Sequence, residues 1–178
     1  MQRLLAEGLQ QAGINQWSMT SGNRGRMDDA VASYIESVEL ADVLRAADAS
    51  DMKSTMLAVR GRFLLYNAYR RQGRSADQAR MLDEAEPLLA NVDLSQAGVE
   101  YARAVVGIRL KQAAGSRARP DEDPTLISLL EAVEQVLERF PDDRMVRRDA
   151  TIAWNVAGYA WSAQREHERA LKEYQRSL

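Results

Sequence analysis

The sequence TIAWNVAGYAWSAQREHERALKEYQRSL, residues 151–178, decides the fold. Its large and small apolar residues recur at helical spacing: Trp154, Ala157, Gly158, Trp161, Ala170 and Tyr174. A large residue begins the first helix, and the Ala-Gly pair lets a second helix approach it closely. Ala170 lies where the two helices touch, and Tyr174 fills the groove toward the next element. The spacing therefore predicts two helices packed as a hairpin.

This order of residues resembles the tetratricopeptide repeat (TPR) signature, W-x2-L-G-x2-Y followed by Ala and, four residues later, Phe or Tyr. The resemblance implies an all-α fold, an α-α superhelix (a TPR-like solenoid) of about four helix pairs. It implies one domain over residues 1–178, with pairs at about 2–49, 51–91, 95–140 and 143–178. Four pairs of about 34 residues leave part of the chain over, so we expect irregular repeats with insertions.

Composition favours the same class. The chain of 178 residues is long enough for an ordinary core, its aromatic content is 6%, and it has only two Phe and four Pro. The absence of Cys excludes disulfides and thiolate chemistry. Apolar runs are much shorter than the ~18 residues of a membrane span. We expect a cytoplasmic, bacterial protein that does not bind membranes, and the excess of Arg and Ala over Lys suggests a GC-rich source.

The first pair is the least regular. A helix is predicted from Gln2 to Ala12, with Gly8 as the residue of close packing, followed by a loop from Gly13 to Arg26. The second helix carries one apolar face, formed by Ala30, Tyr34, Val38 and Ala41. Trp17 falls in the predicted loop. It either folds back over the first pair or stays exposed as an interaction anchor.

The second pair is divided at Gly73, which ends its first helix, and Ser75-x-x-Gln78 reads as a capping box that begins the next helix. The expected buried residues of this pair are Leu65, Tyr69, Ala79 and Leu82.

In the third pair, Asp123 is the predicted N-cap and Pro124 the first residue of a helix that Pro141 closes. An amphipathic stripe follows: Leu126, Leu129, Leu130, Val133, Val136, Leu137 and Phe140.

The chain ends at Leu178, within the usual length of a last TPR helix and without a polar capping helix behind it. We expect either a fragment of a larger regulatory or signalling protein or an end that another chain covers. The helix from Glu166 to Leu178 would then expose an apolar flank, including Leu171, through which the chain forms a homo-oligomer.

Charge is sorted by helix. Residues 52–74 hold six basic residues and no acidic one, whereas 27–51 hold seven acidic residues and one basic residue. The same alternation continues with the basic segments 95–117 and 144–165 and the acidic segments 75–93 and 120–143. In TPR folds, the first helices of the pairs line the concave surface, so the resemblance implies a basic groove that attracts an acidic peptide. Alternatively, neighbouring helices simply pair their charges.

The candidate partner-binding residues lie on the first helices of the pairs: Arg60, Tyr66, Arg70, Arg71, Arg109, Lys111, Asn155 and Tyr159. The function expected is that of a scaffold binding a protein or an acidic peptide, and the alternative is a structural oligomerisation module. Nucleic acid is not expected as a partner, because the sequence pI of about 5.6 is far below that of a nucleic-acid-binding domain. Some TPR domains clamp C-terminal carboxylates, but Asn67 and Asn155 are displaced from that pattern.

Other polar features do not form a catalytic or metal site. His167, the single histidine, stands between Glu166 and Glu168 without further ligands. Residues 121–123 lack the spacing of a calcium loop, and Gly22–Gly25 lack the context of a phosphate loop. No hydrolase or metalloprotease motif occurs. We therefore expect no enzyme activity, no cofactor and no bound metal.

Overall fold

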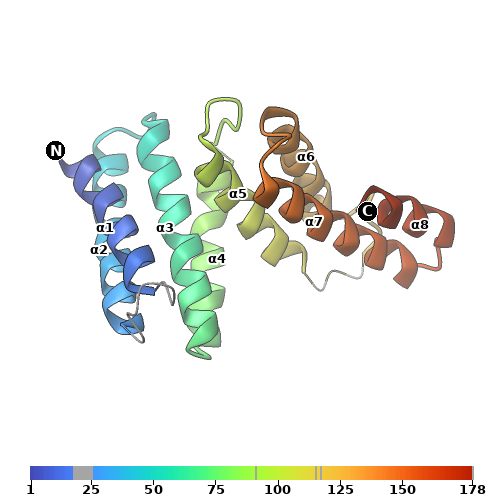
Figure 1. The fold of residues 1–178 in the computed structure, drawn as a ribbon, viewed down its shortest axis with the longest axis horizontal. Helices are drawn as coiled ribbons and strands as arrows, with labels where there is room; N and C mark the ends of the chain where they lie inside the picture. The colour runs from blue at the N-terminus through green and yellow to red at the C-terminus, as the bar shows by residue number, and fades with distance from the viewer. Residues whose placement is uncertain (18–25, 91, 115, 117, 178) are drawn as a thin grey trace. The chain divides into compact units, whose positions relative to one another are not determined.

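A computed structural model describes residues 1–17, 26–90, 92–114, 116 and 118–177. These residues form eight α-helices and no strand, which confirms the all-α prediction for the described part of the chain (Figure 1). The helices are α1 Gln2–Trp17, α2 Met27–Ala47, α3 Met52–Arg71, α4 Ser75–Leu89, α5 Val99–Ala113, α6 Pro124–Arg139, α7 Arg144–Ala163 and α8 His167–Arg176. Each of the four expected pairs contains two of them.

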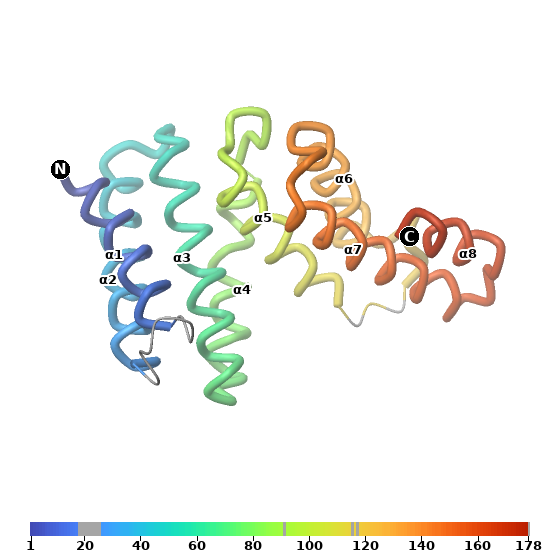
Figure 2. Tube along the Cα trace, in the orientation of Figure 1, coloured from blue at the N-terminus to red at the C-terminus, as the bar shows by residue number. Residues whose placement is uncertain are grey.

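The chain divides into two compact units, Met1–Asp93 with α1 to α4 and Leu94–Leu178 with α5 to α8. Within each unit, helices that follow one another in the sequence pack against one another, as the trace in Figure 2 shows. Helices α1 and α3 also touch, as do α5 and α7. Contacts between consecutive helices within each unit, and between α1 and α3 and between α5 and α7, are consistent with a helical repeat.

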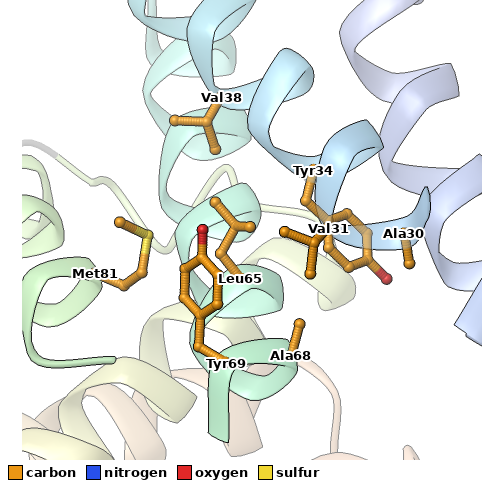
Figure 3. Packing of buried hydrophobic residues seen from close by; sticks show 8 residues of the cluster. All are labelled: Ala30, Val31, Tyr34, Val38, Leu65, Ala68, Tyr69 and Met81. Carbon is orange, nitrogen blue, oxygen red and sulfur yellow. The ribbon is translucent and has the colours of Figure 1, made fainter. Parts of the chain in front are cut away.

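The core of unit 1 forms where α2, α3 and α4 meet. Figure 3 shows its buried cluster: Ala30, Val31, Tyr34, Val38, Leu65, Ala68, Tyr69 and Met81. Ala30, Tyr34, Val38 and Ala41 are all buried, so the predicted apolar face of α2 is confirmed. A ring as large as that of Tyr34 contributes much of the area that such a core removes from water.

The predicted end of the first helix was wrong. Helix α1 continues through Gly13 to Trp17, because Gly13 packs against α2 and does not begin a loop. A Cβ atom at Gly13 would overlap the Tyr34 ring, whereas one at Gly8 would meet nothing, so Gly13 and not Gly8 is the residue of close packing. Trp17 packs against the core cluster, with its ring centroid 6.4 Å from that of Tyr34. The Gly22–Gly25 stretch lies outside the described residues.

Two details of the second pair also differ from prediction. Ser75 is not a cap, because α4 already begins at Ser75 and Arg74 occupies the N-cap position without a side-chain hydrogen bond. Ala79 is exposed and Leu82 half-buried, whereas Met81 reaches the core. The contact surface of α4 is therefore rotated from the one that the repeat pattern indicated. Leu65 and Tyr69 are buried as predicted.

The local signals of α6 are confirmed. The Asp123 carboxylate accepts a hydrogen bond from the Thr125 backbone N–H at 2.8 Å, and Pro124 begins the helix. Leu126, Leu129, Val133 and Val136 are buried, and the other three residues of the stripe are half-buried.

The stretch that decided the fold forms α7 and α8. Ala157, Gly158, Trp161 and Ala170 are buried. A Cβ atom at Gly158 would lie 2.6 Å from the Tyr174 ring, so the small residue lets the ring of the following helix approach. The same contact joins Gly13 and Tyr34 in unit 1.

Helices α3 and α7 end in the same turn. The Arg74 N–H donates to the Tyr69 carbonyl at 2.9 Å, and the Glu166 N–H donates to the Trp161 carbonyl at 3.0 Å. The residue before each donor is left-handed, Gly73 with φ 70° and Arg165 with φ 63°. This geometry is the Schellman motif, which favours glycine at the left-handed position.

Arg165→Gly is expected to raise the free energy of unfolding by about 1 kcal/mol, because a non-glycine residue is strained in the left-handed region. Gly73→Ala should lower it by a similar amount. Urea titration followed by circular dichroism measures both. A neutral Arg165→Gly would mean that the side chain of Arg165 compensates the backbone strain.

Candidate functional site

The eight candidate residues fall in both units. Arg60, Tyr66, Arg70 and Arg71 lie on α3 in unit 1, and Arg109, Lys111, Asn155 and Tyr159 lie on α5 and α7 in unit 2. Each unit holds four of the eight candidates.

On α3, only the C-terminal arginines are open to solvent. Arg70 and Arg71 are exposed, and neither forms an ion pair with any described residue. The Arg71 guanidinium lies 5.2 Å from the centroid of the Trp17 ring, close enough for a cation–π contact. Arg70 and Arg71 are thus available to an acidic partner.

Arg60 and Tyr66 are less accessible than the sequence suggested. Arg60 is half-buried and donates a hydrogen bond to the Gln10 side-chain oxygen at 3.2 Å. Gln10 is itself fully buried and donates to the Leu57 carbonyl at 2.9 Å, so this chain of bonds joins α1 to α3. Tyr66 is half-buried and packs against the core cluster. Both residues contribute to the packing of unit 1.

Arg62, also on α3, forms ion pairs with acidic residues of the neighbouring helices. Arg62 is buried, and its guanidinium pairs with Asp42 of α2 at 2.7 Å and with Glu84 of α4 at 3.3 Å. In unit 2, Arg103 of α5 pairs with Asp149 of α7 at 2.8 Å. For Arg62 and Arg103, the basic and acidic residues of neighbouring helices therefore pair with one another, as the alternative interpretation of the charge pattern states.

The α5 candidates, Arg109 and Lys111, are both half-buried, and each has an interaction within the chain. They are therefore weaker candidates than the exposed residues of α7. There, Tyr159 is 63% exposed, and Asn155 is exposed and accepts a hydrogen bond from the Ser177 hydroxyl at 3.3 Å. Ile152, two turns before Tyr159, is also partly exposed. A rigid aromatic ring beside polar groups suits peptide recognition.

Three further arginines belong to the predicted basic segment 144–165 but were not among the eight candidate residues. Arg144, Arg147 and Arg148 are exposed at the start of α7 and form no ion pair with the described residues. A signal for them was present in the sequence. Asp149 is the single acidic residue of α7, and Arg103 engages it. The positive charge of α7 that no acidic residue of the helix offsets is therefore concentrated in its first two turns.

The aspartates of the acidic segment 121–123 bind other side chains of unit 2. Asp121 accepts hydrogen bonds from Arg119 and Arg169, and the Arg119 bond is the main cause of its lowered pKa. The Asp123 carboxylate is bound by the hydroxyls of Ser116 and Thr125, which lower its pKa in the same way. Asp121 remains exposed to solvent, and Asp123, the N-cap of α6, is half-buried.

The expected apolar flank of α8 is small in the described residues. Leu171 is 57% exposed, and the remaining exposed residues of this helix are polar or charged. Leu178, the other residue expected there, lies outside the described part of the chain.

The described residues contain neither a candidate metal site nor a candidate membrane span. No three His, Cys, Asp or Glu side chains gather there in a way that could hold a metal ion. None of the helices combines the length and apolar character that crossing a membrane requires. Neither the comparison with protein-family models nor the comparison with curated proteins finds a match for this chain.

Proposed function

We propose that this chain is a TPR-like helical-repeat scaffold that binds an acidic segment of a partner polypeptide. The observation that carries the proposal is the set of exposed arginines without ion pairs in the described chain, on α3 and at the start of α7, together with the open ring of Tyr159. Arginine binds carboxylates with two parallel hydrogen bonds, which suits Asp and Glu side chains.

The repeat part of the proposal is supported by two features that recur in the units. In each, a glycine of one helix receives the tyrosine ring of the next, Gly13 with Tyr34 and Gly158 with Tyr174. A left-handed residue also ends α3 and α7 with the same pair of backbone bonds. Stacked pairs of this kind form extended binding surfaces in solenoid proteins.

Reversing the charges of three exposed arginines should weaken binding. For the variant Arg70→Glu, Arg71→Glu, Arg148→Glu, we expect the Kd for a labelled peptide of alternating Glu and Leu to rise at least about tenfold, which corresponds to roughly 1.4 kcal/mol. Fluorescence anisotropy measures it. The wild-type affinity should also fall as salt is raised, since screening acts over about 8 Å at physiological ionic strength.

The matched control reverses charges elsewhere. Arg80 already pairs with Asp77 and Glu84, and Lys172 is exposed on α8. Arg80→Glu, Lys172→Glu should leave the Kd within about twofold of wild type, because neither residue lies on the proposed surfaces. Equal losses in both variants, or equal binding of a peptide of alternating Lys and Leu, would reject a basic recognition surface.

A second candidate function is self-association through the end of α8, which the exposed Leu171 favours. Stable interfaces bury about 800 Å² per partner, far more than one leucine provides, so other residues would have to take part. Light scattering during the same titrations separates the two functions: a mass that rises with protein concentration and falls in Leu171→Glu supports self-association.

A further inference from the structure

A hollow of about 240 Å³ opens in unit 2 between α6, α7 and the end of α8. Its walls are formed by Leu137, Arg147, Ala150, Thr151, Trp154, Arg176 and Ser177. Leu137 and Ala150 provide an apolar wall, and the other side chains carry polar groups. The volume is below the roughly 300–1,000 Å³ of most small-molecule sites, so the hollow suits a single side chain better than a whole metabolite.

One residue of the wall, Trp154, has a buried polar group that lacks a hydrogen-bond partner among the described residues. Trp154 lines the hollow, and its indole N–H is buried with no acceptor among the described residues. A buried donor without an acceptor is costly, and in most proteins such a group is satisfied by a neighbour, water or ligand. An acceptor oxygen placed beside Trp154 would remove that cost.

Arg147 supplies a charge at the same place. Its side chain is exposed, and its one hydrogen bond to a described residue is a long one of 3.5 Å to the Asp142 carbonyl. It has no ion pair in the described chain, and Arg144 and Arg148 lie within one turn of it on α7. This side of the hollow is therefore positively charged.

The opposite wall is held by ion pairs, and its three ionic groups carry one positive and two negative charges. The Arg176 guanidinium lies 4.9 Å from the Trp154 ring centroid and pairs with Glu134 at 2.6 Å and Glu173 at 3.4 Å. These two carboxylates outweigh its single positive charge, and the pair with Glu134 holds the end of α8 against α6. Thr151 donates to the Ser177 carbonyl at 3.4 Å across the same space. An anion entering the hollow would meet its positive charge on the Arg147 side.

We propose that this hollow is the anchor site for one Glu or Asp side chain of the partner polypeptide. The carboxylate pairs with Arg147, and the buried Trp154 indole N–H turns toward the hollow to donate to it, while the methylene groups pack on Leu137 and Ala150. This inference deepens the proposed function, on which it rests, by naming one anchor point outside the residues chosen from the sequence. The partner class follows from the size of the hollow and from its pairing of an apolar wall with a cationic one.

Nuclear magnetic resonance of the ¹⁵N-labelled chain tests the anchor directly. The protein has three tryptophans, so it gives three indole N–H signals, and the Trp154→Phe variant identifies the one from Trp154. We expect N-acetylglutamate N-methylamide to move that signal saturably and the neutral N-acetylglutamine N-methylamide to bind at least about fivefold more weakly. Arg147→Gln should weaken glutamate binding by a similar factor, whereas Lys172→Gln, on an exposed position of α8, should not.

Four outcomes would overturn the anchor: no saturable shift of the Trp154 signal, equal binding of the glutamine probe, an Arg147→Gln variant that binds as wild type, or tighter binding of inorganic phosphate than of the glutamate probe. The last would indicate a phosphate-bearing ligand. The anchor and the scaffold proposal fail separately. If the Glu-Leu peptide binds without moving the Trp154 signal, the anchor falls alone. If the glutamate probe binds here and no acidic peptide does, the scaffold proposal falls.

Discussion

Gly13→Ala is expected to lower the free energy of unfolding by about 1–3 kcal/mol, the usual cost of forcing extra atoms into a packed core. Gly8→Ala, in the same helix, should raise it by up to about 1 kcal/mol, because alanine is the better helix former. The difference follows from the surroundings: a Cβ atom at Gly13 overlaps the fully buried Tyr34 ring, and one at Gly8 meets nothing.

Urea titration of the two variants measures this difference, and a third variant checks its cause. Tyr34→Leu removes the ring that a new methyl group would strike, so Gly13→Ala should cost less in that background than in the wild type. The cost at Gly158 should be smaller than at Gly13, because the Tyr174 ring is half-buried and can move outward. A Gly13→Ala variant as stable as Gly8→Ala would mean that α1 and α2 do not pack through this contact.

Tyr34→Ala should be the most destabilising single change in unit 1, at about 3–5 kcal/mol, because it leaves a cavity the size of an aromatic ring at the centre of the core. Tyr34→Phe should instead be neutral or stabilising. The Tyr34 hydroxyl is buried with no partner among the described residues, so removing it relieves an unsatisfied polar group.

The same hydroxyl predicts a pH dependence. Burial raises the pKa of Tyr34 from 10.0 to about 12, with Arg60 acting in the opposite direction. Above pH 10 the unfolded chain loses this proton while the folded chain retains it, so stability falls as the pH rises toward 12, by up to about 1.4 kcal/mol per pH unit. Tyr34→Phe lacks this component. Urea midpoints of both proteins below pH 10 and near pH 12 test it, and equal losses in the two proteins would contradict it.

The sequence predicted those parts of the fold that local interactions determine. The Asp123 cap, the Pro124 start and the stripe of α6 each depend on residues a few positions apart, and all three are confirmed. The turn at Gly73 also depends on neighbouring residues alone, and it too is confirmed. The Gly158 and Ala170 contacts span two helices, but a known motif records their spacing, so they too were recognisable.

The errors concern contacts between elements. Gly8 and Gly13 look equivalent in the sequence, and only the position of Tyr34 distinguishes them. Continuation of α1 through Gly13 follows from that same packing. Ala79 and Met81 differ in burial because α4 is rotated against α3, which no spacing within α4 specifies.

For the candidate surface, the sequence predicted the net charge of each segment but not which charged side chains are exposed. The sequence showed that the segment of α3 is basic, but not that Arg62 is held by Asp42 and Glu84 while Arg70 and Arg71 stay exposed. Which arginine is available depends on which acidic side chain of a neighbouring helix can reach it. The arginines at the start of α7 were counted in the basic segment 144–165, but the sequence does not show that Arg103 pairs with Asp149 and leaves them exposed.

The scaffold proposal is tested most directly by mapping where an acidic peptide binds. A Glu-Leu peptide carrying a photoreactive benzoylphenylalanine would be cross-linked to the wild-type chain and the adducts located by mass spectrometry. The account predicts saturable adducts on the C-terminal half of α3, near Tyr66 to Arg71, and along α7 from Arg144 to Tyr159, which a tenfold excess of unlabelled peptide removes. Adducts confined to the acidic helices α2, α4 and α6, or adducts that the competitor does not reduce, would contradict it.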